Sequence, residues 1–222
     1  MYNVSMMKKR ILIGLGILLV AAGILFLVLR GQGGDIVTVD EIHAPSEGTG
    51  SIAEKVIGDP DKAKVIVYEY ADYGCSHCAE WNRRFNSLIE KYGDDLALVF
   101  RAYNLGFNNG TIASKAATAA QVQGYFGEYK DLLFNNQSEW MYADSDKIED
   151  VLVKYFEEVT EGKGDTNKFK EDLKSDAVRK RVNFEHRMGE KANLKGTPMF
   201  RMGGEMLDLA TALETIEQKL TQ

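Results

Sequence analysis

The stretch ADYGCSHCAEW, residues 71–81, holds both cysteines of this 222-residue chain, three positions apart. The run just before it, KVIVYEY at 64–70, is rich in β-branched and aromatic residues, which is typical of a buried strand. The residues after it carry apolar side chains at helical spacing: Trp81, Phe85, Leu88, Ile89 and Tyr92. A second apolar run, LALVF at 96–100, predicts another strand. The sequence therefore predicts a β–α–β unit with the cysteines where strand becomes helix.

A cysteine at the start of a helix has a specific chemical use. The first sulfur, on Cys75, is expected near unpaired backbone N–H groups and the positive end of the helix dipole, which both favour thiolate over thiol. The dipole contributes about 0.3 to 2 kcal/mol, so larger effects need direct hydrogen bonds to the sulfur. Ser76 offers a hydroxyl and His77 an imidazole, while Cys78, one turn in, is expected to be shielded and to act as the resolving thiol.

The cysteine pair allows two other interpretations. The first interpretation is half of a zinc site, but zinc usually takes four ligands and the chain has no second cysteine pair. Its three histidines are His43 in a predicted linker, His77 between the cysteines, and His186 among charged helical residues, where an exposed position is expected. No metal site is predicted. Two inert buried cysteines are the remaining alternative.

Residues 11–29, ILIGLGILLVAAGILFLVL, carry no charge. A helix of that length is about 28 Å long, close to the hydrocarbon core of a bilayer. The basic group KKR precedes it, so we expect 1–10 in the cytoplasm, 11–29 as a single-pass signal-anchor in the cell membrane, and an extracytoplasmic catalytic domain. A cleaved signal peptide is the alternative. Outside the cytoplasm no thiol pool keeps cysteines reduced.

The rest of the chain divides into a linker and one domain. Residues 30–50 are rich in Gly, Ser, Pro and acids and predict a flexible linker, and 51–222 predict the domain. Within it, about 107–193 is a block of helices. A strand at 197–202, a hairpin partner at 206–209 and a final helix over 209–220 follow. The pattern predicts an α/β fold with a helical insertion.

The charge of the chain excludes one class of partner. The formal net charge is −6, and all acidic residues lie beyond the first thirty positions. Because binding to nucleic acid needs a basic face, this acidic body is expected to bind no nucleic acid.

Three segments together carry a family resemblance: YEYADYGCSHC (68–78), GTPMF (196–200) and AQVQGYFGEYKDLLFNNQSEW (120–140). Through these segments the chain resembles the DsbA-like thiol-disulfide oxidoreductases over about 52–221. Among them it resembles the membrane-anchored members most. The resemblance implies a thioredoxin-like fold with an inserted helical domain. The family often has Pro-His between its cysteines where this chain has Ser-His, so the strength of oxidation is not carried over.

The resemblance also implies roles for residues outside the cysteine pair. It predicts a cis peptide bond at Thr197–Pro198, in a loop that faces the disulfide and, with Met199, binds substrate peptide. Glu69 falls where many relatives carry a buried acid, which would relay a proton to or from Cys78. An exposed strand glutamate is the other interpretation.

The function expected is a thiol-disulfide oxidoreductase that introduces disulfide bonds into exported cysteine-containing proteins, with Cys75 forming the mixed disulfide. We expect a monomer that needs no organic cofactor. Family resemblance implies a quinone-linked membrane partner that re-oxidises the pair. A reductase or isomerase using the same pair is the first alternative. A non-enzymatic module that delivers copper(I) or another metal is the second.

Overall fold

The structure is a computed structural model that describes residues 39–222. The predicted cytoplasmic segment 1–10 and signal-anchor 11–29 lie outside the described residues. Within 39–222, no helix has the length and apolar content needed to cross a bilayer.

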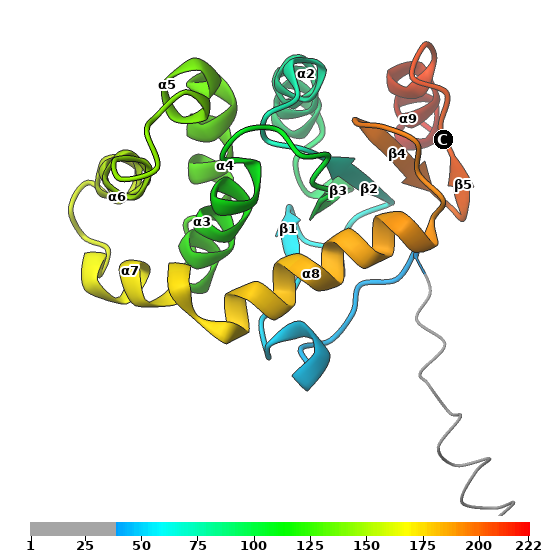
Figure 1. The fold of residues 1–222 in the computed structure, drawn as a ribbon. Helices are drawn as coiled ribbons and strands as arrows, with labels where there is room; N and C mark the ends of the chain where they lie inside the picture. Colours follow the sequence, from blue (N-terminus) through cyan, green and yellow to red (C-terminus); the bar gives the residue numbers. More distant parts are fainter. Residues whose placement is uncertain (1–38) are drawn as a thin grey trace, which may run out of the picture. The chain divides into compact units, whose positions relative to one another are not determined.

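A five-stranded sheet in the order β1-β3-β2-β4-β5 forms the centre of the domain (Figure 1). The strands are β1 (Lys55–Ile57), β2 (Val65–Ala71), β3 (Leu96–Ala102), β4 (Met199–Met202) and β5 (Glu205–Met206). β2 and β3 run parallel, and the other neighbouring pairs are antiparallel. Both parallel strands are almost wholly buried, which explains their continuous apolar sequence.

The predicted β–α–β unit is present as β2, helix α2 (Ser76–Tyr92), a short 3-10 helix η2 (Gly93–Asp95), and β3. One hydrophobic core lies between this unit and the C-terminal helix α9 (Ala212–Leu220). In it the Phe200 ring lies 4.8 Å from the rings of both Trp81 and Phe85. Trp81 is thus a core residue, as expected.

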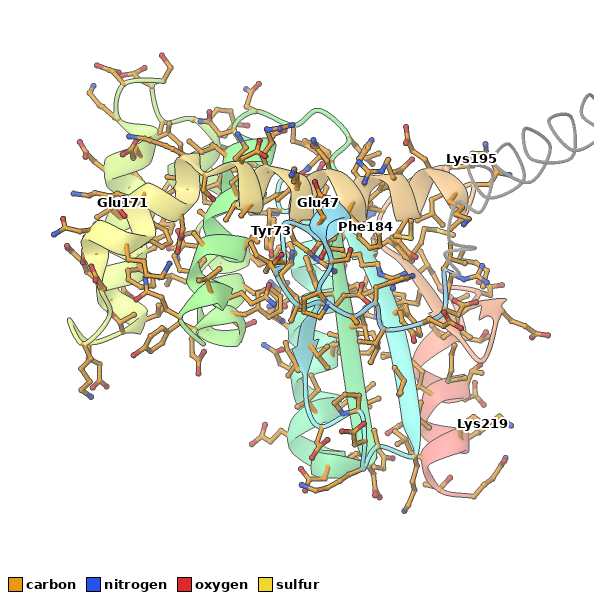
Figure 2. The ribbon with its side chains drawn as sticks, turned by 90° about the horizontal axis from the view of Figure 1, so that it is seen from below. Glu47, Tyr73, Glu171, Phe184, Lys195 and Lys219 are labelled. Atoms are coloured by element: carbon orange, nitrogen blue, oxygen red, sulfur yellow. The ribbon has the colours of Figure 1, made fainter. Side chains whose placement is uncertain are left out.

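Six helices connect β3 to β4 and lie within the range predicted for the insertion. They are α3 (Gly110–Val122), α4 (Phe126–Asn135), α5 (Gln137–Met141), α6 (Ile148–Val159), α7 (Thr166–Lys174) and α8 (Asp176–Lys191). Helices α3 to α7 gather beside the sheet, and α8 runs back along the domain (Figure 1). In Figure 2, α8 extends from the side of Glu171 past Phe184 towards Lys195. A second core joins these helices to the cysteine turn.

The C-terminal hairpin and the first strand differ from the prediction. The second hairpin strand comprises only Glu205–Met206. α9 begins at Ala212, because 207 and 208 have no regular structure and 209–211 form a turn. β1 was not predicted from the sequence. It is only three residues long and pairs with β3 at the edge of the sheet.

Residues 39–50 were predicted as part of a flexible linker, and for these residues the prediction is wrong. The Arg101 guanidinium donates to the carbonyl oxygens of Val39, at 2.5 Å, and of Glu41, at 2.6 Å. The His43 ring packs on Phe184 with centroids 5.1 Å apart, and η1 (Glu47–Thr49) follows. The composition of this segment is that of a loop, but buried charges of the domain bind its backbone.

Candidate thiol-disulfide site

Cys75 is the N-cap residue of α2, with φ −81° and ψ 120°. The turn before it is built by Asp72, which is fully buried. The Asp72 carbonyl accepts from Cys75 N at 3.0 Å, and its carboxylate accepts from Gly74 N at 2.9 Å and Leu105 N at 2.5 Å. One acid therefore fixes the cysteine turn and the loop after β3 together.

Gly74 allows a close approach between these two loops. A Cβ atom added at Gly74 would lie 2.4 Å from Cβ of Phe107, closer than real Cβ atoms come. Any larger residue would force the cysteine turn and the loop 103–109 apart. The glycine is therefore required by packing.

The surroundings of Cys75 favour its thiolate. The pKa of Cys75 is lowered to about 5, first by the hydrogen bond from the Cys78 thiol and then by the backbone N–H groups of Cys78 and His77 and by Thr197, against the opposing effect of burial. The two backbone donors lie at the open end of α2, where no residue of the helix accepts from them. Cys75 as a whole residue is 9% exposed whereas Cys78 is fully buried, so Cys75 is the more accessible of the two.

Cys78 has the opposite character. It is fully buried, and burial together with the neighbouring Cys75 raises the pKa of its thiol far above the ordinary range. Both cysteines are free thiols in this structure. The pair therefore divides into an accessible acidic thiol and a shielded one, as the sequence predicted.

The loop before β4 faces the cysteines. The Thr197–Pro198 bond is cis, as the resemblance predicted, and the Thr197 carbonyl oxygen lies 3.5 Å from Cys75 Sγ. Antiparallel pairing of Tyr70 with Met199 holds this loop at the end of β2, beside the cysteine turn. Pro198 is buried, and Thr197 and Met199 are half-buried. The three predicted substrate-binding residues thus follow one another next to the accessible sulfur.

Glu69 lies in the interior, so the exposed-strand interpretation is wrong. Its side chain is 1% exposed, and neither carboxylate oxygen has a hydrogen-bond partner among residues 39–222. Burial raises the pKa of Glu69 to about 7; the charge of Lys130 opposes the rise and that of Asp131 adds to it. The Glu69 charge in turn contributes to the raised pKa of Cys78.

Sequence reasoning missed a polar network between α2 and α4. The Asp131 carboxylate accepts from the side-chain amides of Asn82, at 2.8 Å, and Asn86, at 2.9 Å. The fully buried Lys130 ammonium donates to the amide oxygens of the same two asparagines. The signal in the sequence was a pair of asparagines four positions apart on the redox helix, which face one direction.

The remaining predicted residues occupy different positions. Ser76 and His77 are exposed at the start of α2. His43 is half-buried beside Glu54, and His186 is half-buried with its ring stacked on Tyr103 at 4.9 Å, so neither lies free on the surface. Among residues 39–222, no three His, Cys, Asp or Glu side chains are grouped so that they could hold a metal ion.

A dithiol at the start of the first helix, opposite a cis-proline loop and beside a helical insertion, defines a protein of the thioredoxin-fold class with a DsbA-like arrangement. The family model described as thioredoxin matches residues 51–221. The chain belongs to this family.

Solved structures share the fold. Oxidised BdbD from Bacillus subtilis is 21% identical with a TM-score of 0.64, covering 82% of this chain and 98% of that one. The thiol-disulfide exchange protein alpha-DsbA2 from Wolbachia pipientis is 19% identical with a TM-score of 0.64, covering 76% and 86%. At these identities the likeness describes the fold.

The chain is also similar to part of a curated transport protein. It is 30% identical over 152 residues to the Na(+)/H(+) antiporter NhaA of Herminiimonas arsenicoxydans, which covers 68% of this chain. It spans only 22% of the length of that relative.

Proposed function

We propose that this protein is an extracytoplasmic thiol oxidase that introduces disulfide bonds into exported proteins through Cys75 and Cys78. The observation that carries the proposal is the contrast between the two sulfurs. Cys75 is accessible and stabilised as thiolate, whereas Cys78 is buried and holds its proton.

The contrast favours the reduced form of the pair. A lowered pKa stabilises the dithiol state above the pKa of about 5, and the stabilisation disappears below it. At pH 7 the thiolate stabilises the dithiol by about 2 kcal/mol relative to an ordinary cysteine, allowing for partial solvent exposure. This free energy corresponds to a reduction potential roughly 40 mV higher, which makes the disulfide more oxidising. A disulfide of this kind takes electrons from substrate thiols.

The reaction proceeds in two exchanges. A substrate thiolate attacks Cys75 Sγ of the oxidised pair, the Cys75–Cys78 bond breaks, and Cys78 leaves and takes up a proton. A second substrate thiolate then attacks the substrate sulfur of the mixed disulfide and releases Cys75 as its stabilised thiolate. The substrate loses two electrons and the protein gains them.

Glu69 supports the first exchange as a proton donor. Its pKa of about 7 means that it is about half protonated at neutral pH, so it can supply the proton that Cys78 needs on leaving. In the reverse direction, the carboxylate takes that proton back before Cys78 attacks a mixed disulfide.

The segment 11–29 supports a location at the cell membrane, with the domain on the extracytoplasmic side. A quinone-linked membrane protein is the class of partner that would re-oxidise the dithiol. Cysteine-containing exported proteins are the substrates of this proposal.

Redox titration of the Cys75–Cys78 pair against glutathione tests the direction of the reaction. We expect a potential above that of a general dithiol reductant, about −230 mV or higher given the roughly 40 mV derived above, and stoichiometric oxidation of a reduced unfolded protein. A potential near −270 mV would instead assign a reductase. Cys75→Ser should abolish oxidation. Cys78→Ser, which keeps the Cys75 thiolate but forms no disulfide, should accumulate a mixed disulfide when it is mixed with a disulfide-bonded substrate, because no second thiol resolves it.

A further inference from the structure

The amide of Gln137 reaches from the helical insertion to the backbone of the cysteine turn. Its Nε2 atom donates to the carbonyl oxygen of Tyr73 at 2.6 Å and to that of Cys75 at 2.9 Å. Gln137 is the first residue of α5, 62 positions from Cys75 along the chain. One side chain thus spans Gly74 and binds the carbonyls on both sides of it.

The Cys75 carbonyl has a second donor inside the redox helix. Ala79 N donates to it at 3.2 Å, which is the first backbone bond of α2. The direction of this carbonyl is coupled to ψ of Cys75, which is 120°. Two donors from different elements therefore hold the N-cap conformation, and with it the place of the sulfur near the Cys78 and Thr197 groups.

The helix that carries Gln137 is itself firmly held. The buried Trp140 donates from Nε1 to the Leu133 carbonyl at 2.8 Å, and its own carbonyl accepts from Asn109 Nδ2 at 2.9 Å. Tyr155 Oη donates to the Glu139 carboxylate at 2.8 Å. Because α5 is fixed on three sides, Gln137 transmits the position of the insertion to the cysteine turn.

We propose that Gln137 is a positioning residue of the thiol site: its amide holds the Tyr73 and Cys75 carbonyls so that Cys75 Sγ stays at the open end of α2, opposite Thr197. A primary amide is suited to this task. It offers two N–H donors to two acceptors and brings no charge next to the thiolate. The proposal rests on the proposed function only in taking Cys75 as the sulfur that exchanges with substrate.

The test is the titration of Cys75 in Gln137→Met, which keeps the length of the side chain and removes its donors. We expect the pH midpoint of the Cys75 titration to rise by about half to one pH unit. The titration is monitored by thiolate absorbance or by the rate of alkylation. Because the Cys78 pKa is far higher, a single low-pH transition belongs to Cys75. At pH 7 the potential of the pair should become more reducing, by at most about 30 mV for a tenfold effect.

Gln137→Glu is the second variant. An ionised carboxylate would face two carbonyl oxygens and add a negative charge near the sulfur, so we expect a larger rise in the Cys75 pKa than with Gln137→Met. The matched control is Tyr155→Phe, which removes a hydrogen bond to α5 without touching the cysteine turn. We expect it to lower the free energy of unfolding slightly and to leave the Cys75 midpoint unchanged.

The proposal is wrong if both Gln137 variants titrate like the parent, or if Tyr155→Phe raises the midpoint as much as Gln137→Met does. If the variants do not fold, NMR of the unmutated protein tests the proposal instead. Its Gln137 side-chain amide resonances should move with the titration of Cys75, and constant resonances would contradict the proposal. The readouts need no oxidase activity, so a reducing potential would overturn the proposed function while leaving this test intact.

Discussion

At the scale of single residues, burial decides the chemistry of the site more than residue type does. Glu69 and Cys78 are both ionisable groups enclosed in apolar surroundings, and burial raises the pKa of each. Cys75 differs because it caps a helix and receives hydrogen bonds. Two identical cysteines three positions apart therefore have opposite proton affinities.

Glu69→Gln should stabilise the protein in a pH-dependent way. The folded-state pKa of about 7 lies above the ordinary 4.5, so ionisation of Glu69 opposes folding once the pH exceeds about 4.5, and the effect is complete above 7. We expect the variant to gain about 2 to 3 kcal/mol at pH 8 and nothing at pH 4. Urea unfolding at the two pH values measures this.

The same variant separates the role of Glu69 in proton transfer from its effect on stability. Resolution of the mixed disulfide by Cys78 should slow at least several-fold near pH 7, because the buried thiol loses its proton acceptor. Rapid-quench measurement of the mixed disulfide gives this rate. An unchanged rate in a stabilised variant would leave Glu69 without a catalytic role.

The accessible thiol gives a simpler measurement. Cys75 should react with iodoacetamide with a midpoint near pH 5, and Cys78 should hardly react below pH 9. Mass spectrometry of the alkylated peptides assigns the two sites. A midpoint near 8.5 for Cys75 would remove the basis for thiolate stabilisation.

At the scale of elements, a buried ionic cluster connects Glu54, which directly precedes β1, to the sheet and to α8. Glu54 pairs with Arg101 at 2.7 Å and with Arg181 at 3.0 Å, and Arg181 pairs with Glu185 at 3.0 Å. Glu185 also accepts from the buried Lys55 and from Ala102 N. Such charges are tolerated in the interior because each one has partners.

Glu54→Gln should destabilise the domain by about 3 kcal/mol near pH 7, because it leaves buried guanidinium groups without their counter-charge. Burial alone raises the pKa of Glu54, but hydrogen bonds from His43 and Arg101 and the charges of Arg101 and Arg181 outweigh it and lower the pKa to about 2. The stabilisation is thus present above pH 4.5 and lost as the pH falls towards 2.

Thermal unfolding between pH 2 and 8 checks this effect. The melting temperatures of parent and variant should converge at the acidic end. Lys62→Met, which removes an exposed ion pair with Asp59, is the matched control and should change stability little. A constant difference between Glu54→Gln and the parent at every pH would contradict the assigned pKa.

At the scale of the whole molecule, the chain divides into the segment 1–38 and the compact unit Val39–Gln222. The unit contains the sheet, the insertion and the candidate site, and its two cores meet around α2. The uncharged segment 11–29 lies in the other part. The proposed signal-anchor therefore lies outside the sequence range of the unit that carries the two cysteines.

The full chain should therefore fractionate with membranes and resist extraction by alkaline carbonate, whereas residues 39–222 expressed alone should remain in the supernatant. The domain should be open to protease added outside spheroplasts. Release of the full-length chain by carbonate would contradict the anchor, and a shortened N-terminus by mass spectrometry would favour a cleaved signal peptide instead.

The β–α–β unit, the helical insertion and the position of Cys75 at a helix start could all be predicted from the sequence. These features depend on local patterns: apolar periodicity, capping residues and the spacing of two cysteines. The cis bond at Thr197–Pro198 was predicted from a motif, through the resemblance.

The contacts between residues far apart in the sequence could not be predicted, because they depend on how the elements pack. Whether Glu69 was buried depended on strands and helices that cover it from elsewhere in the chain. The packing of 39–50 depended on Arg101, and the contact of Gln137 with Cys75 joins residues 62 positions apart. A local pattern fixes which way a side chain points along its own element, but the neighbours it meets, and hence its pKa, are set by how the elements pack.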